Sequence, residues 1–171
     1  VKKCVADIAS NFTTNRMLID YEERFYNKLA QRKKLMLDKN YIMARQIAAW
    51  KRKVSAAWDN IVIRDVKRAE IESEAMYVGK KYHFELTIDL AGLQKEDIGA
   101  ELVVATQIEA GQAANVVETR RLEIVASDDK SVTLALDYAP EHTGMFDVAL
   151  RVFPVNDNLE HRMDFALVKW A

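Results

Sequence analysis

The sequence contains few cysteines, glycines and prolines, and each scarcity excludes a class of protein. Cys4 is its one cysteine, so an internal disulfide cannot form and nothing indicates an oxidising compartment. Five glycines and two prolines are too few for collagen-like repeats or extended linkers. No apolar run reaches the roughly 18 residues of a membrane helix, and the first residues lack the apolar core of a signal peptide. These absences predict a soluble, cytoplasmic protein without a membrane partner.

Side chains for catalysis are equally scarce. Three histidines are present: His83 on the polar face of a predicted strand, His142 in a turn and His161 in a loop. We interpret all three as solvated side chains, because none stands beside a nucleophile or at metal-ligand spacing. The glycines do not form a phosphate-binding loop before a helix. The acidic pairs at 96–97 and 128–129 are interpreted as solvated turn residues. The sequence therefore predicts no catalytic, cofactor-binding or metal-binding residue in this chain.

The residues that are present are divided unevenly along the chain. A hydrophobic fraction of 50% over 171 residues is enough to form a core. Residues 1–60 hold 13 lysines and arginines against 6 acidic residues, whereas residues 61–171 hold 12 against 20. This change of charge predicts two parts, a helical segment over 1–60 and a second domain over 61–171. The sequence pI of about 6.4 and the lack of a nucleic-acid motif argue against a nucleic-acid partner.

The first part has helical periodicity. Thr13 is positioned to cap a helix, with Phe12 before it packing on the following turn. A loop is expected at Asp38–Asn40. Apolar residues recur at helical spacing both before and after this loop, which predicts two helices with one apolar stripe each. The first stripe consists of Met17, Leu18, Tyr21, Phe25 and Leu29, and the second of Ile47, Trp50, Val54 and Trp58. We interpret Trp50 and Trp58 as core residues, and a sugar-stacking role would require their rings to be exposed.

After Asn60 the period changes to two, which is typical of half-buried strands. In one segment Tyr82, Phe84, Leu86 and Ile88 alternate with His83, Glu85, Thr87 and Asp89, so the first set is expected to point inward. Strands are predicted at 61–69, 82–89, 98–105, 115–125, 131–138, 145–153 and 163–170. No helical pattern lies between them. The expected fold class is therefore α+β: N-terminal helices followed by an all-β, immunoglobulin-like antiparallel sandwich.

Several of these segments resemble a known family. The stretch from Phe12 to Tyr21, with Tyr26 beyond it, resembles the closing helix of glycogen and α-glucan phosphorylases, which has the pattern Phe-Ser-x-x-Arg. Ala44–Lys51 followed by Trp58 resembles the next helix in the bacterial branch that carries an extra C-terminal β domain. Leu90–Ile98 and the ending Leu167–Ala171 also resemble that branch. The resemblance covers essentially the whole chain, and the order of the segments is its strongest feature.

The resemblance implies a role in carbohydrate metabolism. Members of that family transfer glucosyl units between α-1,4-glucan and phosphate, with pyridoxal phosphate held on a lysine of a Gly-rich segment. No such segment occurs in this sequence, so no catalytic or cofactor-binding residue can be transferred to it. Because the chain begins at Val1 within an amphipathic pattern, we expect a C-terminal module with a structural or glucan-guiding role, whose partner is the missing catalytic body. The first apolar stripe is then the expected interface with that body. In the isolated chain it is expected either to fold back on the second stripe or to pair two copies, and we favour the pairing.

Two alternatives from other functional classes remain open. The segment Glu85–Ile98 also resembles the start of the α-crystallin domain of small heat-shock proteins, a chaperone and interaction module. Ala91 replaces the proline of that family, and the Ile-x-Ile anchor is missing from the C-terminus. The match covers fourteen residues and leaves the N-terminal helices unexplained. A free-standing carbohydrate-binding sandwich is the other alternative, with α-glucan as its ligand.

Overall fold

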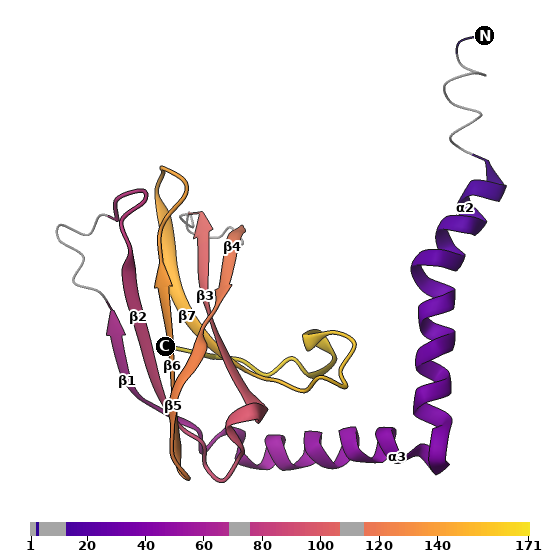
Figure 1. Cartoon of the computed structure of the whole chain (residues 1–171), viewed down its shortest axis with the longest axis horizontal. Coiled ribbons are helices and arrows are strands. Elements are labelled where there is room, and N and C mark those ends of the chain that lie inside the picture. The colour runs from indigo at the N-terminus through magenta and orange to yellow at the C-terminus, as the bar shows by residue number, and fades with distance from the viewer. Residues whose placement is uncertain (1–2, 4–12, 69–75, 107–114) are drawn as a thin grey trace. The chain divides into compact units, whose positions relative to one another are not determined.

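The computed structural model describes residues 3, 13–68, 76–106 and 115–171, and the chain forms two compact units divided between Ala49 and Trp50 (Figure 1). Between residues 13 and 49 the first unit is helical. The described residues of the second unit hold the last turns of a helix and the strands β1 to β8. The domain boundary expected near residue 60 stays a prediction.

In the first unit a capped helix starts after Thr13. Thr13 has extended backbone angles, and its side-chain oxygen accepts a hydrogen bond from the N–H of Arg16 at 3.2 Å. The cap expected at Thr13 is therefore confirmed, whereas the packing of Phe12 lies outside the described residues. Helix α2 runs over Thr14–Tyr21 and continues into a π-helical turn, Glu22–Tyr26. The wider turn places the centre of the Tyr21 ring 6.4 Å from the centre of the Tyr26 ring and 6.2 Å from that of the Phe25 ring.

A sharp backbone change interrupts helix α3, which is assigned to Asn27–Trp58. Asp38 is extended, and Lys39, Asn40 and Tyr41 follow with φ of 44°, 56° and 64°. Asn tolerates this left-handed region, whereas Lys and Tyr adopt it at a cost. The Asp38 carboxylate accepts the N–H of Lys39 at 2.9 Å, which stabilises the turn. The loop expected at Asp38–Asn40 is confirmed and extends to Tyr41.

Within the described ranges, eight strands form two four-stranded antiparallel sheets, with the orders β1-β2-β6-β5 and β4-β3-β7-β8. This strand order is consistent with the immunoglobulin-like sandwich expected from the sequence. The bounds are β1 Val62–Arg68, β2 Tyr82–Asp89, β3 Ile98–Thr106, β4 Val116–Arg121, β5 Glu123–Ser127, β6 Ser131–Tyr138, β7 Phe146–Pro154 and β8 Lys169–Trp170. The α+β fold class predicted from the sequence is confirmed, and β2 and β6 have the predicted bounds.

Two strand predictions were wrong. The strand expected over 115–125 is two strands in different sheets, β4 and β5, because the chain passes between the sheets at Leu122. Leu122 is buried there, and its N–H donates to the carbonyl of Ala100 at 2.9 Å. The strand expected over 163–170 is mostly a 3-10 turn, Arg162–Phe165, followed by the short β8. The turn forms because the side chains of His161 and Asp164 cap it reciprocally.

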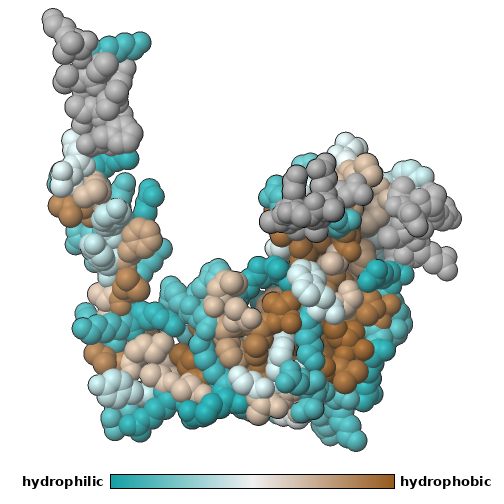
Figure 2. All heavy atoms as spheres, turned by 180° about the vertical axis from the view of Figure 1, so that it is seen from behind, coloured by the Kyte–Doolittle hydropathy of each residue, from teal (hydrophilic) through white to brown (hydrophobic). Residues whose placement is uncertain are grey.

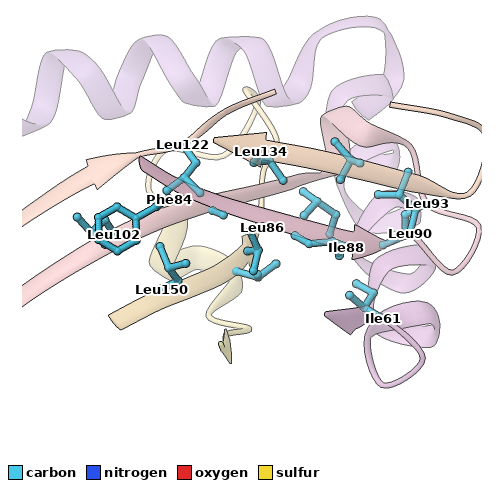
Figure 3. Packing of buried hydrophobic residues seen from close by; sticks show 14 of the residues in the cluster. Ile61, Phe84, Leu86, Ile88, Leu90, Leu93, Leu102, Leu122, Leu134 and Leu150 are labelled. Atoms are coloured by element: carbon cyan, nitrogen blue, oxygen red, sulfur yellow. The ribbon is translucent and has the colours of Figure 1, made fainter. Parts of the chain in front are cut away.

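The core of the sandwich lies between the two sheets, as Figure 3 shows. In β2, the inward-facing Tyr82, Phe84, Leu86 and Ile88 are at most 2% exposed. The residues that alternate with them are exposed or half-buried and lie on the outer face of the sheet. Leu86 is paired with Val66 on one side and Leu134 on the other. The inward and outward assignment of this strand is therefore confirmed.

Candidate interaction site

The N-terminal helix has an apolar face that is open to solvent. We define the apolar helix face as the five residues of the first stripe, whose exposed fractions range from 44% to 59%: Met17, Leu18, Tyr21, Phe25 and Leu29. Brown, hydrophobic side chains are visible along this helical segment in Figure 2. Contiguous exposed apolar surface of this kind marks an interaction site. The sequence identified these same residues as an expected interface, which stays a prediction.

Charged residues lie along the same helix. The Asp20 carboxylate is 3.7 Å from the guanidinium of Arg16 and 4.0 Å from that of Arg24, one turn away in each direction. Exposed pairs at this spacing add only about 0.3–0.5 kcal/mol to helix stability. Their main consequence is a polar border beside the apolar helix face, which is the usual composition of an interface rim.

The last turns of α3 are attached to the sandwich by a set of polar contacts that we call the helix clamp: Trp50, Lys51 and Lys53 on the helix, with Asp97, Asp164 and Phe165 on the sandwich. Asp97 lies at its centre. One of its carboxylate oxygens accepts the indole N–H of Trp50 at 2.7 Å, and the other accepts the ammonium of Lys53 at 3.0 Å. Both helix residues therefore point at one carboxylate placed just before β3.

A second group of clamp contacts lies at the 3-10 turn near the C-terminus. The ammonium of Lys51 donates to the carbonyl of Asp164 at 2.6 Å and lies 5.5 Å from the centre of the Phe165 ring. The Trp50 ring meets the same Phe165 ring edge to face at 5.3 Å. These contacts explain why the segment 162–165 is a turn against the helix instead of a strand. The helix end and the sandwich therefore form one unit.

The helix C-terminus receives a further cation from β8. The ammonium of Lys169 donates to the carbonyls of Ile61 at 2.8 Å and Asp59 at 3.3 Å. A cation at this position satisfies carbonyls beyond the helix end and complements the helix dipole. Val54 and Trp58 add apolar contact, since both are buried in the sandwich core. The polar contacts of the helix clamp and of Lys169, together with the apolar contacts of Val54 and Trp58, thus attach the last two turns of α3 to the sandwich.

The environment of Asp97 favours its ionised form. Burial alone would raise the pKa of this carboxyl, but hydrogen bonds from the Gln94 N–H, Lys53 and Trp50 outweigh it and hold the pKa below 3.8. A carboxyl whose pKa is lower in the folded state stabilises the fold above its unfolded pKa, and that contribution is lost as pH falls through the folded value. The helix clamp is therefore expected to weaken only in acid, below about pH 4.

Replacing Asp97 by alanine is expected to lower the free energy of unfolding by about 1–3 kcal/mol, because the indole N–H of Trp50 and the ammonium of Lys53 lose their acceptor. The neighbouring Glu96→Ala is the matched control, since Glu96 is exposed and is expected to change stability by no more than about 0.5 kcal/mol. Urea unfolding followed by tryptophan fluorescence measures both. Equal losses for the two variants would show that the clamp does not stabilise the fold.

The two tryptophans of the second stripe have different surroundings. Trp58 is 6% exposed and lies in the core, as the sequence indicated, so its ring offers no face to a sugar. Trp50 is half-buried, with its ring against Phe165 and its N–H on Asp97. Asp97 itself was interpreted as a solvated turn residue, and this interpretation was wrong. The spacing of Trp50 and Lys53 on one helix face was the signal available for it.

The histidines lie where the sequence placed them. His83 is exposed on the outer face of β2, and the hydrogen bond that its ring donates to the Asp137 carboxylate at 2.7 Å, with Glu85 nearby, raises its pKa above 6.5. His142 is exposed in a loop, and His161 caps the 3-10 turn by accepting the N–H of Met163. Among the described residues no group of three or more His, Cys, Asp and Glu side chains could hold a metal ion. Over the same residues, no helix is long and apolar enough to cross a membrane.

A cavity of about 780 Å³ opens between the two sheets at one end of the sandwich. Its walls include Phe84, Leu102 and Tyr138. The Tyr138 hydroxyl donates to the Glu118 carboxylate at 3.1 Å, and burial together with this neighbour raises its pKa to about 12. The other Glu118 oxygen lacks a well-oriented hydrogen bond, but the guanidinium of Arg120 lies 2.5 Å from it and balances its charge. The described residues that line the cavity do not include a lysine.

Comparison with known proteins identifies relatives of this chain. The family model of the glycogen phosphorylase C-terminal domain matches residues 58–171. The maltodextrin phosphorylase of Thermococcus litoralis is 27% identical over 99% of this chain and 20% of its own length. The glycogen phosphorylases of Mycobacterium tuberculosis and Mycobacterium bovis are 25% and 24% identical, each over 90% of this chain and 15% of its own length. The chain thus spans a fifth or less of the curated relatives it matches. No solved structure matches significantly.

Proposed function

This chain belongs to the glycogen phosphorylase C-terminal domain family, and from that premise we propose that it is the non-catalytic C-terminal module of an α-glucan phosphorylase. The observation that carries the proposal is the apolar helix face. Five large side chains stay 44–59% exposed there, and burying each would contribute about 1.5–3 kcal/mol. The occupant we propose is the catalytic body of the same polypeptide.

The proportion of each relative that the chain matches supports this occupant. The chain covers 15–20% of the proteins it resembles, which leaves four fifths or more of such a protein outside it. A domain interface within one polypeptide requires no separate partner, and the two sides are held at high effective concentration. The family model also accounts for the segment that resembled an α-crystallin domain, since residues 85–98 lie within the match to 58–171. The chaperone alternative is therefore not favoured.

The helix clamp supports a bracing role for the module. Trp50, Lys53 and Asp97 fix the last turns of α3 on the sandwich through one half-buried and one exposed hydrogen bond. These contacts make the last turns of the helix part of the sandwich unit. In this proposal the module braces the catalytic body, and glucosyl transfer between α-glucan and phosphate takes place outside this chain.

Pyridoxal phosphate, the cofactor implied by the family, does not fit the described part of this chain. Covalent binding needs a lysine facing an enclosed site, and the residues lining the described cavities include none. We therefore assign the cofactor to the proposed catalytic body.

The 171-residue chain mixed with pyridoxal phosphate is expected to show no Schiff-base absorbance after dialysis and no release of glucose 1-phosphate from glycogen. The polypeptide that contains both the catalytic body and this chain is expected to show both. Measurable turnover by the chain alone, or a complete polypeptide that binds the cofactor but does not act on α-glucan, would overturn the proposed function.

A further inference from the structure

A row of four side chains crosses the outer face of the second sheet. The strand register places Glu101 of β3 opposite Arg121 of β4 on one side and Arg151 of β7 on the other. Arg151 is in turn opposite Trp170 of β8. Neighbouring strands lie about 4.8 Å apart, so the row extends over roughly 14 Å. It is an extended strip of polar and aromatic groups, longer than one small ligand requires.

The middle of the row is a buried ionic cluster. The Glu101 side chain is 7% exposed and is paired with the guanidinium of Arg151. Arg162, from the 3-10 turn, adds a second guanidinium at 2.5 Å from the same carboxylate, and lies 5.5 Å from the centre of the Phe153 ring. Burying such a cluster is not by itself an efficient way to stabilise a fold. Its effect is to hold two guanidiniums, with N–H groups to spare, in fixed positions on this face.

The end of the row is an exposed indole. Trp170 is 58% exposed, and the guanidinium carbon of Arg151 lies 5.7 Å from the centre of its ring. An isolated exposed aromatic residue needs no explanation. Trp170 differs because Arg151, itself held by Glu101, packs against its ring. The result is a planar apolar platform beside fixed hydrogen-bond donors.

We propose that Trp170, Arg151 and Arg162 form a contact site for an α-glucan chain, an inference that rests on the proposed function of the module. The apolar C–H face of a sugar ring stacks on an indole, and its hydroxyl oxygens accept hydrogen bonds from guanidiniums. The Glu101 carboxylate offsets one of the two guanidinium charges, and the N–H groups that it does not bind can donate to neutral hydroxyl oxygens. The length of the polymer suits the row of roughly 14 Å. The site would tether the substrate polymer to the module, away from the chemistry.

Native electrophoresis of the 171-residue chain in gels with and without glycogen tests the proposal. The wild-type chain is expected to be retarded by glycogen and released by maltoheptaose. Trp170→Ala is expected to weaken the retardation about tenfold, because a stacking ring and its buried area are lost. Tyr77→Ala is the matched control, since Tyr77 is 59% exposed and lies outside the row; its retardation is expected to equal that of the wild type.

The site would be overturned if glycogen did not retard the wild-type chain, or if it retarded Trp170→Ala as strongly as the wild type. Retardation that salt abolishes but maltoheptaose does not would also overturn it. The last result would indicate an acidic partner. Urea midpoints of both variants verify folding, and Trp170 lies on a two-residue edge strand whose loss leaves the core intact. None of these measurements involves the catalytic body, so failure of the glucan site is distinguishable from failure of the proposed module function.

Discussion

Replacing Leu86 by alanine is expected to lower the free energy of unfolding of the sandwich by about 2–5 kcal/mol. Leu86 has no exposed surface and lies in the middle of β2, with Val66 and Leu134 as its cross-strand partners. Truncation removes buried methyl groups and leaves a cavity between two sheets that cannot close fully. Chemical unfolding in urea, monitored by tryptophan fluorescence, gives the difference.

Thr87→Ala is the control for this experiment. Thr87 follows Leu86 directly, points to the outer face and contacts the hydroxyl of Thr133 at 3.2 Å. Losing one half-exposed hydrogen bond is expected to lower the free energy of unfolding by no more than about 1 kcal/mol. If the two variants lose the same stability, the inward and outward assignment of β2 is wrong, and with it the register of the first sheet.

The second large effect concerns the apolar helix face. Leu18→Glu combined with Phe25→Lys is expected to weaken binding of the chain to the catalytic body by about 3–6 kcal/mol, or roughly two to four orders of magnitude, because two large apolar side chains no longer enter the interface. Both residues are more than half exposed in the chain by itself, so the substitutions leave the sandwich intact. Isothermal titration calorimetry with the catalytic body measures the affinity.

Asn27→Glu combined with Gln31→Lys is the matched control on the same helix. Both positions are exposed and polar, and the new pair has the favourable order of charges at a spacing of four. Affinity is expected to be unchanged. The isolated wild-type chain is expected to self-associate through the same face, and the Leu18→Glu, Phe25→Lys variant to remain monomeric. A control variant that loses as much affinity as the test variant would show that the apolar helix face is not the interface.

Residue alternation predicted the parts of the fold in which each strand has one buried face. In β2 and β6 the pattern and the observed bounds coincide, because burial of every second residue leaves a clear period of two. The helix start at Thr13 and the loop at Asp38 could also be predicted from the sequence. In both cases the side chain accepts a hydrogen bond from a backbone N–H close by in the chain. Local chemistry was sufficient at these positions.

The structural features that the sequence did not predict depend on contacts between residues that lie far apart in the chain. The segment 115–125, predicted as one strand, belongs to β4 and β5 because Leu122 enters the core between the sheets. Asp97 belongs to the clamp because Trp50, 47 residues earlier in the chain, comes to lie beside it. The row that joins Glu101 to Trp170 exists only through the pairing of four strands. The residues around Leu122, Asp97 and Glu101 in the sequence carry no signal for these contacts, and the only available signal was the spacing of Trp50 and Lys53 on the helix that meets Asp97.

Sedimentation velocity of the 171-residue chain mixed with the proposed catalytic body, prepared as a separate polypeptide, tests the central claim most directly. We predict a one-to-one complex that sediments faster than either component and that the Leu18→Glu, Phe25→Lys variant fails to form. Independent sedimentation of the two components at high concentration, with Met17, Tyr21 and Leu29 still exposed, would contradict the assignment of this chain as a docked phosphorylase module.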